Sequence, residues 1–73
     1  MADLPALLIE LERAAEAERA KLDGLTGEEY AAQWRVWRDA AATFQAAVAD
    51  HPVEGMTRHE LEQAAKKAVR YTE

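Results

Sequence analysis

The sequence predicts an all-α fold, in which a long antiparallel helical hairpin carries a shorter third helix packed on it, as in a three-helix bundle. Apolar residues recur at spacings of three and four along two long stretches, which is the period of an amphipathic helix. All three glycines fall between the predicted helices, and no stretch alternates as a strand would. We therefore expect one helical domain over residues 1–73.

The first helix is expected over about residues 4–22. Asp3 is a suitable N-cap, and Pro5 fits the first turn, where its missing N–H has no helical partner to lose. Asp23 and Gly24 supply the stop signal.

The second and third helices are expected over about residues 27–50 and 58–71. Thr26 with Glu29, and Thr57 with Glu60, have the spacing of capping boxes. The second helix ends before Pro52, because the residue before a proline avoids helical angles. The inward residues expected in the third helix are Leu61, Ala65, Ala68 and Val69.

The hairpin is expected to close along two heptad seams whose facing positions sum to 52, which centres the pairing on the first connector. This register sets small Ala15 against large Trp37, so that Trp37 is expected in the core. Glu18 is the polar residue on the seam, and we expect its carboxylate to reach water, Lys21 or the Trp34 indole N–H. The two seams are Leu4, Leu8, Leu11, Ala15, Glu18, Leu22 and Tyr30, Trp34, Trp37, Ala41, Phe44, Val48.

The third helix is too short to cover the hairpin, at roughly 21 Å against roughly 36 Å for the second helix. It is expected to shield the open end, leaving the end near the first connector half covered. Exposed aromatic residues at that density are typical of an interface. We predict a non-enzymatic interaction module that forms a homodimer or binds a helix of another protein, through Tyr30, Gln33, Trp34, Val36 and Trp37.

A small DNA-binding regulator is the alternative interpretation, because one face of the third helix is basic. A net charge of −5 and a long second connector both disfavour it. The interleaved Arg35 and Arg38 are better explained by an outward-facing Arg35 paired with Asp39. The residues of the predicted basic face are Arg58, His59, Gln63, Lys66 and Arg70.

The residue types disfavour catalysis and metal binding. Serine, cysteine and asparagine are absent, and the two histidines, His51 and His59, have no ligand spacing around them. We therefore predict no enzyme, no cofactor and no small-molecule substrate. With no basic start before Glu10, no signal sequence and no membrane segment are expected, and the prediction is a cytoplasmic protein.

The chain also resembles short, alanine-rich, uncharacterised actinobacterial proteins. The likeness lies in a long tryptophan-containing helix followed by a terminal stretch similar to residues 58–62 and 64–70. This resemblance implies a helical fold and no particular activity.

Overall fold

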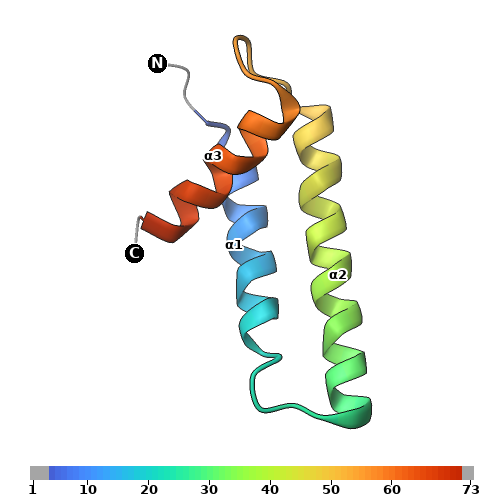
Figure 1. Cartoon of the computed structure of the whole chain (residues 1–73). Helices are drawn as coiled ribbons and strands as arrows, with labels where there is room; N and C mark the ends of the chain where they lie inside the picture. The colour runs from blue at the N-terminus through green and yellow to red at the C-terminus, as the bar shows by residue number, and fades with distance from the viewer. Residues whose placement is uncertain (1–3, 72–73) are drawn as a thin grey trace.

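A computed structural model describes residues 4–71 of the chain and contains three helices in that range, with no strand. They are α1 (Ala6–Ala20), α2 (Gly27–Asp50) and α3 (Arg58–Tyr71). Figure 1 shows α1 and α2 as an antiparallel hairpin, with α3 crossing its open end. The molecule measures 44 × 25 × 16 Å.

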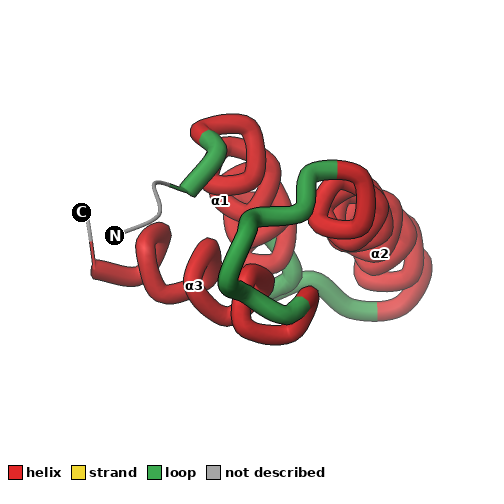
Figure 2. Tube along the Cα trace, turned by 90° about the horizontal axis from the view of Figure 1, so that it is seen from above, coloured by secondary structure: helices red, strands yellow, loops and turns green. Residues whose placement is uncertain are grey.

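Helix α3 crosses obliquely over one side of the hairpin and packs on both α1 and α2 (Figure 2). Its contacts are confined to the end of the hairpin away from the α1–α2 turn (Figure 1). The predicted fold class, a helical hairpin with a shorter third helix, is confirmed.

Helix α1 is two residues shorter at each end than the sequence indicated. Pro5 lies just before the first helical residue instead of inside the first turn, and no side chain among residues 4–71 caps this end. The expected cap, Asp3, lies outside the described residues. At the other end, turn hydrogen bonds from the amides of Leu22 and Asp23 replace the helical pattern, and Gly24 follows with φ of +84°.

Only one of the two predicted capping boxes forms. At α3, the Glu60 amide donates to the Thr57 hydroxyl at 3.1 Å and the Thr57 amide donates to the Glu60 carboxylate at 2.9 Å. At α2, the Thr26 side chain makes no cap hydrogen bond. Gly27 explains the difference, because its φ of +62° turns the first residue of α2 out of the geometry that a capping box requires.

The core lies where the three helices meet, at the open end of the hairpin. Phe44 is its largest side chain, and Tyr30, Trp34 and Trp37 do not belong to it. The two predicted seams therefore belong to the core only in the part nearer the open end of the hairpin. The buried cluster contains Leu8, Phe44, Ala47, Val48, Leu61 and Ala65, with Leu4, Leu11, Val53 and Met56 packed against it.

Candidate protein-interaction surface

Three aromatic side chains of α2 form a partly exposed surface beyond the reach of α3, which we call the aromatic surface. Tyr30 is 43% exposed, Trp34 is 39% exposed, and Trp37 is half-buried. The two indole rings meet edge to face with centroids 6.3 Å apart. The Arg38 guanidinium lies 5.3 Å from the centre of the Trp34 ring, so a cation covers part of this ring.

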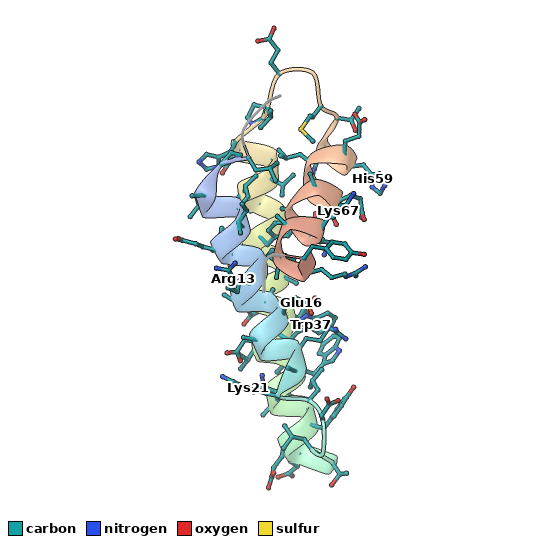
Figure 3. All side chains as sticks on the ribbon, turned by 90° about the vertical axis from the view of Figure 1, so that its left-hand side faces the viewer. Arg13, Glu16, Lys21, Trp37, His59 and Lys67 are labelled. Atoms are coloured by element: carbon teal, nitrogen blue, oxygen red, sulfur yellow. The ribbon has the colours of Figure 1, made fainter. Side chains whose placement is uncertain are left out.

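The aromatic surface lies on the same side of the hairpin as α3. Figure 3 shows Trp37 on that side, below the end of α3. At 100° per residue, Trp34 is about 60° from Trp37 around α2 and Tyr30 is about 20° from it. Helix α3 and the aromatic surface therefore occupy successive parts of one face of the hairpin.

Of the five residues predicted to form one interface, Val36 lies apart, and the Gln33 side chain is engaged with α1. Gln33 faces α1, where its side-chain amide donates 2.8 Å hydrogen bonds to both the backbone oxygen and the carboxylate of Glu18. Val36 is 47% exposed but lies about 160° around the helix from Trp34, on the other side of the hairpin. Gln33 lies about 40° from Trp37 around α2 and so borders the aromatic surface, whereas the helical twist separates Val36 from Trp34.

Glu18 stabilises the end of the hairpin that α3 leaves uncovered. Its carboxylate accepts from Lys21 at 2.9 Å as well as from Gln33, so one of its expected partners is confirmed. The Lys21 hydrogen bond, followed by that from Gln33, lowers the pKa of the Glu18 carboxyl below its usual value. The pair with Gln33 joins α1 to α2 beside the aromatic surface.

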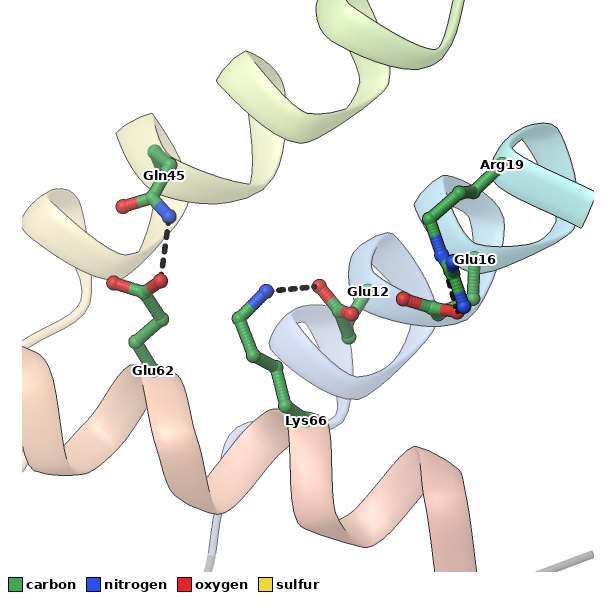
Figure 4. A network of polar contacts seen from close by, with 6 residues as sticks. All are labelled: Glu12, Glu16, Arg19, Gln45, Glu62 and Lys66. Carbon is green, nitrogen blue, oxygen red and sulfur yellow. Dashed lines mark hydrogen bonds and ion pairs between the residues drawn. The ribbon is translucent and has the colours of Figure 1, made fainter. Parts of the chain in front are cut away.

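Glu12 is a buried carboxylate that the sequence reasoning overlooked. Only 3% of the residue is exposed, and its partner is the Lys66 ammonium of α3 at 3.4 Å (Figure 4). Burial raises the pKa of the Glu12 carboxyl, and the nearby Lys66 charge opposes this only in part. The position carried a signal, because Glu12 follows Leu8 by four residues and precedes Ala15 by three.

The DNA-binding alternative requires an exposed basic face on α3, and Lys66 does not contribute to it because it pairs with Glu12 of α1. Its ammonium points towards Glu12 and also lies 5.3 Å from the centre of the Phe44 ring. A second contact, from the Gln45 amide to Glu62 at 2.8 Å, joins α3 to α2 (Figure 4). His59 and Lys67 project from the outer side of α3 (Figure 3).

Asp39 pairs with a different arginine from the one predicted. Its carboxylate lies 4.0 Å from Arg38, whereas Arg35 makes no ion pair in the described part of the chain. The arginine that contacts Asp39 is thus also the one that lies over Trp34.

A cavity of about 490 Å³ lies between α1 and the second half of α3. Its lining contains two ion pairs, Glu12 with Lys66 and Glu16 with Arg19 at 3.1 Å, and also the basic residues Arg13 and Arg70.

Residues 4–71 lack the features of a metal site and of a membrane-spanning helix. They contain no group of three or more histidine, cysteine or acidic side chains placed to hold a metal ion. None of the three helices combines the length and the apolar character needed to cross a membrane.

Comparison with known proteins adds no relative. No family model matches the chain, and neither a curated protein nor a solved structure is significantly similar to it. The aromatic surface is therefore the feature of this chain that bears most directly on its function.

Proposed function

We propose that this chain is a small, non-enzymatic protein-interaction module that self-associates through the aromatic surface. One observation carries the proposal. Tyr30, Trp34 and Trp37 lie together, partly exposed, on the face of the hairpin that α3 covers elsewhere. Tryptophan and tyrosine are the residue types that contribute most to the affinity of protein interfaces.

The composition of the core supports association. Alanine supplies 17 of the apolar residues, and four of the five aromatic residues lie outside the buried cluster. A domain of this size gains only about 3–5 kcal/mol from its own core without a disulfide or metal. Burial of the aromatic surface against protein would remove apolar area from water that the fold leaves exposed.

Sedimentation equilibrium tests the proposal with two glutamate substitutions on opposite sides of the hairpin. We expect the wild-type chain to form dimers at micromolar concentration, with Trp34→Glu shifting the mass to one chain. Val36→Glu adds the same charge at a comparably exposed position about 160° away, and we expect it to remain dimeric. Circular dichroism should report the same helical content for all three proteins.

Two results would contradict the proposal. One is a wild-type chain that sediments as a monomer at roughly 100 μM, a concentration that would populate a dimer with micromolar dissociation constant. The other is a dimer that Val36→Glu disrupts and Trp34→Glu leaves intact, which would move the interface to the opposite side of the hairpin.

A further inference from the structure

The cavity between α1 and α3 is positively charged, although the chain as a whole is acidic. Its lining contributes four basic and two acidic side chains, a net charge of +2. The whole chain has nine basic and fourteen acidic residues, so the part outside the cavity carries five basic and twelve acidic ones. The cavity is therefore a local positive region that attracts anions. Its charged residues are Glu12, Arg13, Glu16, Arg19, Lys66 and Arg70.

Two helical stripes form the walls of the cavity. On α1, most of the lining follows the spacing i, i+3, i+4, i+7 that begins at Arg13, and on α3 it follows i, i+3, i+4 from Lys66. The α1 stripe includes Ala17 and Ala20, whose small side chains leave the space beside α3 unfilled. The volume of about 490 Å³ lies within the range of small-molecule sites.

Both carboxylates of the lining are already held by a cation. Glu16 accepts hydrogen bonds from Nε and Nη2 of Arg19, at 3.2 and 3.1 Å. Glu12 accepts one from the Lys66 ammonium at 3.4 Å. An ammonium has three N–H donors, so Lys66 retains donors for a ligand after it has paired with Glu12. The excess positive charge of the cavity therefore belongs to its two remaining arginines.

Arg13 and Arg70 come from opposite walls of the cavity, and both are exposed. Neither makes an ion pair with any residue of the described range 4–71. A guanidinium presents its N–H donors as a planar fork that matches two oxygens of a phosphate or carboxylate. A phosphate monoester offers three terminal oxygens to two such forks and carries about two negative charges at neutral pH. Its charge and its oxygens thus both suit this pair of arginines.

We propose that this cavity binds a small phosphate monoester, with its phosphate group between Arg13 and Arg70 and with Lys66 as a third donor. The organic part of the ester then lies against the apolar side chains of Ala17 and Val69. Binding of this kind requires no catalytic residue, and it is independent of the aromatic surface, none of whose residues lines the cavity. The sequence did not indicate this site, because its two arginines come from helices far apart in the chain.

Titration of the full ¹⁵N-labelled chain, followed by nuclear magnetic resonance, tests the site. The probe is phenyl phosphate, and inorganic phosphate and phenol represent its two halves. We expect saturable shifts of the backbone amides of residues 13–20 and 66–70, with a dissociation constant of about 0.1–1 mM, because the ligand has to order two flexible arginines. Inorganic phosphate should bind more weakly and phenol should not bind. The indole N–H signals of Trp34 and Trp37 should not move.

Substitutions at exposed positions test the residues that the inference names. Arg13→Gln and Arg70→Gln should each weaken the binding of phenyl phosphate about tenfold, as expected for the loss of a charge-assisted hydrogen bond. Arg35→Gln is the matched control, because Arg35 is exposed, makes no ion pair within residues 4–71 and lies outside the lining. Ala17→Leu fills part of the cavity and should weaken phenyl phosphate more than inorganic phosphate, whereas Ala32→Leu, at an exposed position of α2, should change neither.

Three results would overturn the inference. One is no saturable binding of phenyl phosphate up to about 10 mM. Another is equal weakening by Arg35→Gln, which would mean non-specific attraction to any exposed arginine. The third is equal affinity for inorganic phosphate and phenyl phosphate, which would exclude a site built for an ester. The Trp34→Glu chain should bind phenyl phosphate as wild type does, so failure of self-association and failure of phosphate binding are separate outcomes.

Discussion

Glu12 and Lys66 decide how firmly α3 is held on α1. A carboxylate that is 3% exposed loses most of its hydration, and a single ammonium at 3.4 Å compensates for this loss only partly. The pKa of the Glu12 carboxyl is raised for the same reason, because the effect of burial is larger than the opposing effect of Lys66. Lys66 remains 36% exposed at its side chain, so it can regain hydration if its partner is neutralised, whereas Glu12 cannot.

The two partners should therefore respond unequally to substitution. Lys66→Met leaves an unpaired buried carboxylate and should lower the free energy of unfolding at pH 7 by about 3 kcal/mol. Glu12→Gln should cost much less, and the double variant should recover most of the loss. Chemical denaturation of the three variants measures this, and equal losses in both single variants would contradict the assignment.

The sign of the pH dependence follows from the raised pKa of Glu12. Folded Glu12 binds its proton more tightly than the unfolded chain, so its contribution to stability increases as pH falls from above the folded pKa towards the usual value of 4.5. The loss of stability in Glu12→Gln should therefore grow as pH falls over this range, which chemical denaturation at several pH values measures. Glu10→Gln, at an exposed position of the same helix, is the control.

At the scale of the helices, the two predicted capping boxes show that local backbone geometry determines whether this motif forms its hydrogen bonds. Thr57 and Glu60 satisfy each other's backbone amides at the start of α3, and the Thr57 backbone amide is the first cause of the lowered pKa of Glu60. Glu60 thus adds stability above the usual carboxyl pKa, and this is lost as pH falls through its folded value. The same residue types at Thr26 and Glu29 form no side-chain cap hydrogen bond.

Substitution of the two threonines should separate a formed cap from an unformed one. Thr57→Ala should lower the free energy of unfolding by about 1 kcal/mol, because it removes the hydroxyl that accepts from the Glu60 amide. Thr26→Ala should change it by only a few tenths, since no cap hydrogen bond is lost. Thermal or chemical unfolding monitored by circular dichroism distinguishes these results, and a larger loss for Thr26→Ala would contradict them.

At the scale of the whole molecule, the length difference between α3 and the hairpin divides the aromatic residues into two classes. Phe44 lies beneath α3 and is 1% exposed, whereas Trp34 and Tyr30 lie beyond it. The end of α3 thus separates the core, which stabilises one chain, from the aromatic surface, which we propose joins two chains.

This division gives opposite expectations for two aromatic substitutions. Phe44→Ala should cost about 3–5 kcal/mol, comparable with the whole stability of a domain this size, and should abolish most of the helical circular dichroism. Trp37→Ala should leave a folded chain with a smaller loss of stability, because its ring is only half-buried. A Trp37→Ala variant that unfolds as completely as Phe44→Ala would show that the core extends to the α1–α2 turn.

The sequence by itself determined the helices and their order, because helical periodicity, glycines in connectors and Pro52 act over a few residues. It also predicted from length alone that α3 would cover one end of the hairpin. The existence of a partly exposed aromatic group at the other end followed from these two inferences.

Only the tertiary structure decided which side chains share a surface and which charges meet. Val36 lies outside the aromatic surface because the helical twist turns it about 160° from Trp34, and Gln33 borders this surface with its amide bonded to Glu18 of α1. Lys66 left the basic face because α3 crosses α1 at Glu12, 54 positions earlier in the chain. Sequence periodicity describes one helix at a time, whereas these contacts depend on how three helices cross, which is set by the packing of Leu8, Phe44 and Leu61 in the core.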